Sequence, residues 1–298
     1  MDKTELIEIF NDTQRFYETN EKLENAIQAS KKATKLYEAD EYPVIDRSDI
    51  INGHVKGSGV KEAGDASTHT AALTKHRTFE AAMKIHAVHP DWKIAVLNFA
   101  SATNPGGGVT KGSKAQEESL CRCSTLYPVL TQDWLWRAYY KKNRDAHDNL
   151  HTDDCIYSPN IVICKTDEDS PARMKEADWV FVDVISCAAP NLRPKPNNAY
   201  NADSGKPVVI SREELYRLHV QRAKHIMHVA AGNGADALVL GAFGCGAFMN
   251  DPEVVARAYR EVLKEYGQYF KLVEFAVYCK GHETVNYDAF RRVLTGQR

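Results

Sequence analysis

The chain has 298 residues, of which 43% are hydrophobic and 26% are charged, so it can bury a sizeable core as one large domain or two small ones. Its formal net charge of -2 argues against a general nucleic-acid binder, which carries a strong basic excess, and we expect no sequence-specific contact with nucleic acid. No run of apolar residues is long enough to span a bilayer, so we expect no membrane partner.

The first 90 residues predict mostly helix. Residues Lys3 to Tyr37 are charged and amphipathic, with Leu6 and Phe10 at helical spacing, which predicts one or two helices. Asp40 to Ser67 is rich in turn residues, and Thr74 to Val88 has a helical pattern.

From residue 92 onward, strand and helix patterns alternate, and two of the helices begin with capping residues at Ser211 and Asp251. Strands are expected at Trp92–Ala100, Ile156–Cys164, Trp179–Ile185, Ala237–Gly241 and Leu272–Tyr278, and helices at Ala115–Leu126, Gln132–Lys142, Arg212–Ala231 and Pro252–Tyr266. Asn191 to Lys206 is a polar connection rich in Pro and Asn, expected to form a rim or lid. Such alternation predicts an α/β sheet covered on both faces, with ligand loops at the strand ends.

Three glycines, Gly106, Gly107 and Gly108, follow the first of these strands, and the carboxylates of Glu117 and Glu118 come soon after them. Successive glycines let the backbone adopt positive φ and approach a ligand closely. Two adjacent carboxylates repel each other, and a buried pair can keep one of them protonated as an acid. This suits cleavage of a glycosidic bond. The alternative is a solvated acidic first turn of a helix, which the nearby glycines disfavour.

A second glycine loop, Gly244-Cys245-Gly246, follows the strand at Ala237–Gly241. It lacks the third glycine of the dinucleotide fingerprint, and in the first loop Ser113 stands where a P-loop would place its lysine. A nucleotide triphosphatase and a Rossmann dehydrogenase are therefore both disfavoured. The loop is interpreted as a binding site for a diphosphate.

Seven cysteines lie scattered without C-x-x-C pairs, and no apolar run follows a basic start at the N-terminus, which indicates a reduced, cytoplasmic protein. No motif places a histidine to activate Cys121 or Cys123, so a thiol nucleophile is disfavoured. His219, His225 and His228 share one predicted helix without a metal-binding motif, and we expect them to be exposed or satisfied by hydrogen bonds. We expect neither a metal nor a cofactor.

Taken in order, these motifs resemble those of the microbial (bacterial-type) poly(ADP-ribose) glycohydrolases, which are macrodomain proteins. The resemblance rests on Asn98–Gly108, Gln116–Leu120, Val239–Asn250 and Ser186–Asn191, and on the spacing of Asn286 and Phe290. Cys279 departs from the acidic residue that often ends the last strand in the family. The resemblance implies a three-layer α/β/α macrodomain with a mixed central sheet, a single domain over residues 1–298 with a helical extension at 1–48 and a core at 49–298.

The resemblance also implies hydrolysis of the ribose–ribose O-glycosidic bonds of poly(ADP-ribose), with release of ADP-ribose. Glu118 would be the general acid and then the base for water, and Glu117 would hold ribose hydroxyls. The residues implied to bind substrate are Gly106, Gly107, Gly108, Gln116, Gly244, Cys245, Gly246, Ala247 and Phe248. Among these, Gly244 to Ala247 would donate amides to the diphosphate, and Phe248 would pack along the adenosine or proximal ribose.

Two other functions remain open from the sequence. A mono-ADP-ribosyl hydrolase would use the same ADP-ribose pocket, and a non-enzymatic ADP-ribose reader would keep both glycine loops without needing the two glutamates. The expected partners are poly(ADP-ribose) or ADP-ribose and the ADP-ribosylated proteins that carry it, and the chain is expected to act as a monomer.

Overall fold

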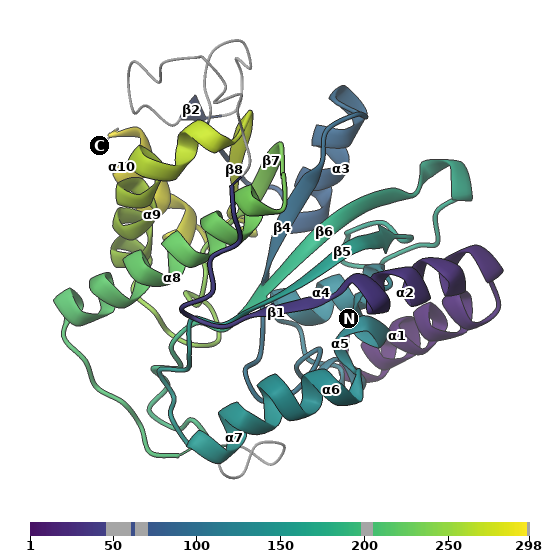
Figure 1. Ribbon diagram of the computed structural model, residues 1–298, viewed down its shortest axis with the longest axis horizontal. Helices are drawn as coiled ribbons and strands as arrows, with labels where there is room; N and C mark the ends of the chain where they lie inside the picture. The colour runs from purple at the N-terminus through teal and green to yellow at the C-terminus, as the bar shows by residue number, and fades with distance from the viewer. Residues whose placement is uncertain (46–60, 63–70, 198–204, 297–298) are drawn as a thin grey trace. The chain divides into compact units, whose positions relative to one another are not determined.

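The protein is described by a computed structural model over residues 1–45, 61–62, 71–197 and 205–296. The chain forms two compact units, Met1–Glu38 with Asn98–Val208 and Ala39–Leu97 with Val209–Arg298. Figure 1 labels their helices and strands. The boundary at residue 97 falls inside strand β4 (Ile94–Phe99), so the two units share that strand. The predicted division into a helical extension at 1–48 and a core at 49–298 stays a prediction.

The first unit begins with helices α1 (Lys3–Glu18) and α2 (Glu21–Ala33). Asp2 and Glu5 form a capping box that satisfies amides at the start of α1, and the apolar face of this helix is buried. The helices expected here are confirmed, but the expected span runs too far. Residues Lys35–Tyr37 form strand β1, which pairs with the next strand of the unit.

Three strands of the first unit pair in the order β1-β5-β6, all antiparallel. β5 (Cys155–Ile163) and β6 (Val180–Cys187) lie within about two residues of their predicted positions and are almost entirely buried. A bulge interrupts their pairing between Ser158 and Ile161, where Asn160 adopts a positive φ of 56°. This bulge is not visible in the strand pattern of the sequence.

Short helices connect β4 to β5 in the first unit. They are the 3-10 turn Val109–Lys111, α4 (Gln116–Cys123), α5 (Leu126–Leu130), α6 (Asp133–Leu135), the π-helix Trp136–Lys141 and α7 (Lys142–Ala146). The helix predicted to Leu126 ends at Cys123, because the Ser124 hydroxyl donates back to the Leu120 carbonyl and Ser124 bridges to Ile163 of β5. A further 3-10 turn, Glu176–Asp178, precedes β6.

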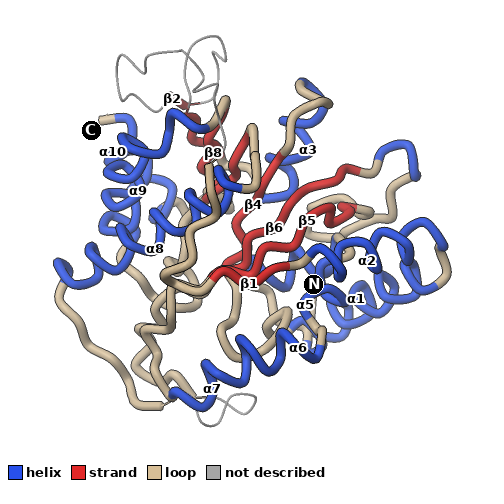
Figure 2. Tube along the Cα trace, in the orientation of Figure 1, coloured by secondary structure: helices blue, strands red, loops and turns tan. Residues whose placement is uncertain are grey.

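The second unit contains parallel strands in the order β4-β7-β8-β3-β2, and Figure 2 draws the strands in red. Their bounds are β7 Ala237–Leu240, β8 Leu272–Ala276, β3 Ala71–Thr74 and β2 Lys61–Glu62. β7 is buried at every position, as is β4 except for its last residue, so both faces of these strands are covered, as expected for parallel strands. The strand β3 corrects the prediction of helix from Thr74, because the helix begins only at Thr78.

Among its described residues the second unit has four α-helices, and the 3-10 turn Gly267–Tyr269 precedes β8. They are α3 (Thr78–Val88), α8 (Arg212–Gly232), α9 (Pro252–Tyr266) and α10 (Val285–Thr295). The caps predicted at Ser211 and Asp251 are confirmed, since each side chain accepts an amide of the first turn. Residues 205–210 and the described part of Asn191–Lys206 are irregular, whereas residues 198–204 and most of Asp40–Ser67 lie outside the described residues.

No helix within the described ranges is long and apolar enough to cross a membrane.

Candidate active site

The two glutamates occupy the first turn of α4, and both side chains are buried. Glu117 is 2% exposed and Glu118 is 6% exposed. The alternative of a solvated acidic turn is therefore wrong. Burying two carboxylates is unfavourable unless other groups hold them, so their hydrogen bonds indicate what the site is built to do.

Glu117 is held through both of its oxygens. The Ser101 amide donates to Oε2 at 2.7 Å, and the Asn98 Nδ2 donates to Oε1 at 3.3 Å. Asn98 also donates to the Ser186 hydroxyl at 2.9 Å, which ties the end of β4 to β6. Glu117 is thus fixed in orientation by the residues at the end of β4.

Gln116, next to Glu117 on α4, also hydrogen-bonds the end of β4. Its Oε1 accepts the Phe99 amide at 2.8 Å. The side chain predicted to bind substrate thus anchors the last residue of β4 in the structure, and its contact with a ligand stays a prediction.

Within the described residues, Glu118 is hydrogen-bonded through one oxygen. Its Oε1 accepts the Gly108 amide at 2.9 Å. Its Oε2 is buried, and nothing in the described part of the chain hydrogen-bonds it. Because an amide N–H marks Oε1 as an acceptor, Oε2 is the oxygen suited to carry a proton.

The glycines of the first loop are needed for both backbone conformation and space. Gly106 and Gly107 have φ of 69° and 59°, which side chains rarely tolerate. A Cβ at Gly107 would lie 2.5 Å from Glu118 Oε1 and 3.1 Å from Glu117 Oε2, and a Cβ at Gly106 would lie 2.6 Å from the Tyr127 ring. A Cβ at Gly108 would overlap the Ser113 hydroxyl. The loop backbone therefore packs directly on the two carboxylates.

The surroundings raise the pKa of both glutamates. Burial, and then the charge of Glu118, raise the pKa of Glu117 from 4.5 to about 8. Burial also raises the pKa of Glu118, although the Gly108 amide and the charge of Arg122 oppose it. Because the two groups titrate together, the pair as a whole retains a proton near neutral pH. A proton donor is therefore available in this site.

The second glycine loop lies between β7 and α9 in the second unit and forms compact turns. Gly244 adopts a φ of 76°, and the Cys245 amide donates to the Ala242 carbonyl at 3.1 Å. That bond engages one of the four amides predicted to bind diphosphate, which leaves those of Gly244, Gly246 and Ala247 as the candidates. Phe248 is half-buried, and its contact with adenosine stays a prediction.

Asn250 and His219 hold this second loop, and the sequence did not single out either for that role. The Asn250 amide donates to the Gly244 carbonyl at 3.0 Å, and its Nδ2 donates to the carbonyls of Gly244 and Phe248 at 3.1 and 3.3 Å. His219 Nε2 faces Asn250 Oδ1 at 2.8 Å. Because Oδ1 can only accept, Nε2 carries the proton, and burial lowers the pKa of His219 to about 4, which keeps it neutral.

The other two histidines of α8 also have hydrogen-bond partners, as expected. His225 Nε2 lies 3.0 Å from the Glu41 carbonyl, and His228 contacts the Pro43 carbonyl and the Tyr266 hydroxyl. Across the described residues, no group of three or more His, Cys, Asp or Glu side chains could hold a metal ion. The expectation that no metal takes part stays a prediction.

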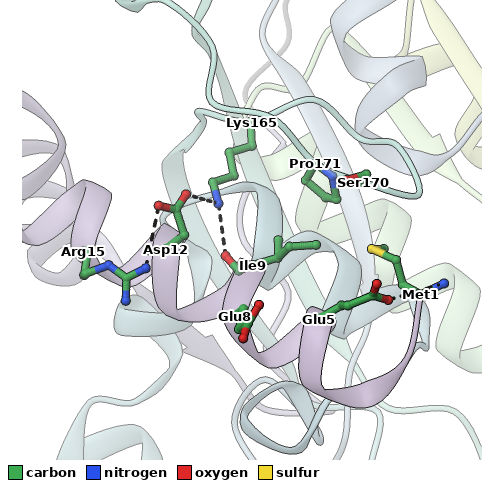
Figure 3. Close-up of a pocket in the computed structure, with 9 residues that line it drawn as sticks. All are labelled: Met1, Glu5, Glu8, Ile9, Asp12, Arg15, Lys165, Ser170 and Pro171. Atoms are coloured by element: carbon green, nitrogen blue, oxygen red, sulfur yellow. Dashed lines mark hydrogen bonds and ion pairs between the residues drawn. The ribbon is translucent and has the colours of Figure 1, made fainter.

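A separate surface pocket of about 460 Å³ lies along α1 in the first unit (Figure 3). Its lining comes from α1 and from the segment after β5, and includes Glu5, Asp12 and Lys165. Lys165 is buried, and its Nζ contacts Asp12 Oδ2 at 2.8 Å and the Ile9 carbonyl at 3.0 Å. None of the residues predicted to be catalytic or substrate-binding lines this pocket, whose interactions fasten α1 to the segment after β5.

Mixed α/β architecture, with a buried glutamate pair after one strand and a glycine-rich turn after another, defines the class of macrodomain-like proteins. A family described as "Microbial-type PARG, catalytic domain" matches residues 4–166, which is more than half of the chain. PARG denotes poly(ADP-ribose) glycohydrolase, and this chain belongs to that family.

Solved structures of the family superpose over nearly the whole chain. Poly(ADP-ribose) glycohydrolase from Deinococcus radiodurans in complex with ADP-ribose is 32% identical, with a TM-score of 0.69, and the match covers 91% of this chain and 97% of that one. The enzyme from Thermomonospora curvata is 27% identical with a TM-score of 0.75, covering 97% and 98% of the two chains.

The Thermomonospora curvata enzyme bound to the inhibitor ADP-HPD gives 26% identity and a TM-score of 0.74, covering 96% and 98%. No curated protein matches the chain. The predicted family and the predicted α/β macrodomain class with its mixed sheet are confirmed.

Proposed function

We propose that this chain hydrolyses the ribose–ribose O-glycosidic bond of poly(ADP-ribose) and releases ADP-ribose, with Glu118 as the general acid. One observation carries the assignment of Glu118: its Oε1 is fixed by the Gly108 amide, while its buried Oε2 has no hydrogen-bond partner in the described part of the chain. Family membership and the ADP-ribose complex of the Deinococcus radiodurans enzyme support the substrate class.

In the proposed reaction, the proton on Glu118 Oε2 passes to the departing glycosidic oxygen as the bond to the anomeric carbon breaks. The ribose develops oxocarbenium character, and the Glu118 carboxylate then takes a proton from the water that attacks the anomeric carbon. Glu117, whose two oxygens are oriented by Ser101 and Asn98, holds ribose hydroxyls during these steps.

The second loop has a binding role in this proposal. Amides of Gly244 to Ala247 hold the diphosphate, in the manner of turns that bind anions, and Phe248 packs on the adenosine or proximal ribose. We further propose that the protein acts as a monomer in the cytoplasm, on polymer attached to ADP-ribosylated proteins, without sequence-specific contact with nucleic acid. The seven free cysteines fit a reducing compartment.

Two alternatives make different predictions. A reader of ADP-ribose has no use for a buried acid, so the burial of Glu117 and Glu118 favours an enzyme. A mono-ADP-ribosyl hydrolase is distinguished by its substrate. The purified protein is incubated with labelled poly(ADP-ribose) and, separately, with mono-ADP-ribosylated protein, and the products are identified. Release of ADP-ribose from the polymer supports the proposal, whereas intact polymer would contradict it.

Glu118→Gln tests the residue assignment. The amide preserves the shape of the side chain but cannot donate and recover a proton, so we expect kcat to fall by about 10²- to 10⁴-fold with ADP-ribose binding retained. Calorimetry measures the binding. Glu24→Gln is the matched control, because Glu24 also lies in the first turn of a helix but is exposed. A Glu118→Gln rate close to that of wild type would contradict the assignment.

A further inference from the structure

Arg122 is a buried arginine one helical turn after Glu118 on α4. It is 3% exposed, and a guanidinium is rarely buried to that degree unless its environment pairs it. Residues four apart lie on the same side of a helix, so Arg122 and Glu118 are neighbours on α4. None of the roles described above uses this charge.

A closed series of hydrogen bonds links Arg122 to Glu118 through the glycine loop. The Arg122 guanidinium donates to the Ser113 carbonyl at 2.7 Å. The Ser113 amide donates to the Gly108 carbonyl at 3.1 Å, and the Gly108 amide donates to Glu118 Oε1 at 2.9 Å. The helical turn from Glu118 to Arg122 completes the series. The position of the amide that holds Glu118 thus depends on where Arg122 holds Ser113.

Helix α1 contacts both Arg122 and the segment that follows the glycine loop. The buried Thr13 hydroxyl lies 2.6 Å from the Arg122 carbonyl, to which it donates. The Lys3 backbone packs against Gly112, where an added Cβ would overlap it. On its other side α1 is fastened by the contact of Lys165 with Asp12, drawn in Figure 3. Helix α1 therefore packs directly against α4 and Gly112.

The charge of Arg122 also acts on the acid itself. It lowers the pKa of Glu118, in opposition to burial, which raises it. Glu117 lies beside Glu118, Cys121 shares α4 with both, and Tyr140 of the π-helix lies near Glu117. The lysines on the adjoining segments, Lys3, Lys111 and Lys114, are exposed. Arg122 is the cation that acts on Glu118 from within the helix.

We propose that Arg122 is a positioning residue for Glu118, which fixes the Gly108–Ser113 segment so that the Gly108 amide holds Oε1 and Oε2 is presented to the scissile bond. This inference rests on the proposed function. The inference adds one requirement to that function: Glu118 acts as the acid only while Arg122 holds the Gly108–Ser113 segment against the following turn of α4. The role does not involve contact with substrate.

Arg122→Met removes both the clamp and the charge. Misplacement of the acid lowers kcat, and we expect a loss of about 10- to 100-fold with a KM close to that of wild type. Loss of the positive charge raises the pKa of Glu118. Since Glu118 must be protonated to act as the acid, the alkaline limb of the kcat profile moves to higher pH. Arg122→Lys keeps the positive charge and a donor group. It should restore most of kcat and return the alkaline limb of the pH profile to its wild-type position.

Arg15→Met is the matched control, because Arg15 lies on α1 and is 63% exposed on its side chain. Kinetics on labelled poly(ADP-ribose) are measured between pH 5 and 9, with thermal unfolding of each variant. If Arg122→Met does not fold, Arg122→Gln, which can still donate to Ser113 but lacks the charge, must show the shifted limb. An unshifted limb in the folded uncharged variant, or a loss confined to KM, would overturn the inference. An inactive wild-type protein would instead contradict the proposed function.

Discussion

The two glycine loops of this protein are held in place by different kinds of interaction. In the first unit, Gly107 packs against two buried carboxylates, and a buried arginine clamps the loop to α4. In the second unit, the Gly244–Asn250 turn is held by the neutral pair Asn250 and His219, and a Cβ at Gly246 would meet nothing within 4 Å. One loop is constrained by packing and charge, the other by a few hydrogen bonds from uncharged groups.

This difference fits the proposed task of each loop. An acid that must donate a proton benefits from burial and from a fixed direction, and both require tight packing. A turn that binds a diphosphate benefits from amide dipoles. Because the Asn250 carboxamide carries no charge and His219 is kept neutral by burial, the groups that brace the turn add no negative charge against the ligand. The comparison therefore predicts that the first loop tolerates much less change than the second.

The largest effect is expected for Gly107→Ala. The new methyl group would lie 2.5 Å from Glu118 Oε1 at a φ of 59°, so either the acid or the loop must move. We expect kcat to fall by at least about 10²-fold, the scale of a misplaced catalytic group. Gly246→Ala is the matched change in the second loop, where the added Cβ would meet no atom of the described chain within 4 Å, so kcat should stay close to that of wild type and any loss should fall on KM. Equal losses in the two variants would remove the distinction between the loops.

Asn250→Ala tests the brace of the second loop. The carbonyls of Gly244 and Phe248 lose their side-chain donor, and the turn loses its fixed shape. We expect ADP-ribose affinity to fall by about 1–2 kcal/mol, the usual range for losing hydrogen bonds of this kind, with kcat on bound substrate less affected. Isothermal titration calorimetry measures the affinity. Asn233→Ala, which removes a bond to the Val229 carbonyl elsewhere in the second unit, is the control.

The sequence singled out the two glutamates and both glycine loops, but not the residues that hold them in place. Glu117, Glu118 and both glycine loops were identified because short motifs of special residues carry them, and the family was identified with them. Arg122 was not identified, and Asn250 entered only as the last residue of the Val239–Asn250 motif without a role, since a single polar residue gives no signal until the fold shows that it is buried. His219 was expected only to be satisfied, and its partner could not be inferred because it lies 31 residues away.

The same reasoning explains the missed elements of the fold. Strand β3 (Ala71–Thr74) is four residues long and is defined by its pairing with β8, which depends on residues some two hundred positions later. Strand β1 follows α2 after a single residue and has too few residues to show alternation. Longer elements such as α8 and α9 were predicted closely, because their caps and periodicity are local.

The smallest effect is expected in the pH dependence of stability, where one buried group in each loop acts with opposite sign. Glu117 titrates near 4.5 when unfolded and at about 8 when folded, so the folded state binds more protons between these values and stability falls as pH rises through this window. His219 titrates near 6.5 when unfolded and at about 4 when folded, so the unfolded state binds more protons there and stability falls as pH drops from 6.5.

Replacing each group by glutamine should therefore flatten a different side of the stability curve. Relative to wild type, Glu117→Gln should gain unfolding free energy as pH rises from about 5 to 8, and His219→Gln should gain it as pH falls from about 6.5 to 4, each by about 1 kcal/mol per pH unit. Urea unfolding at several pH values measures both. A Glu117→Gln curve parallel to wild type above pH 5 would show that the glutamate pair is ionised in the folded protein. The proton donor assigned to the first loop would then have to come from elsewhere.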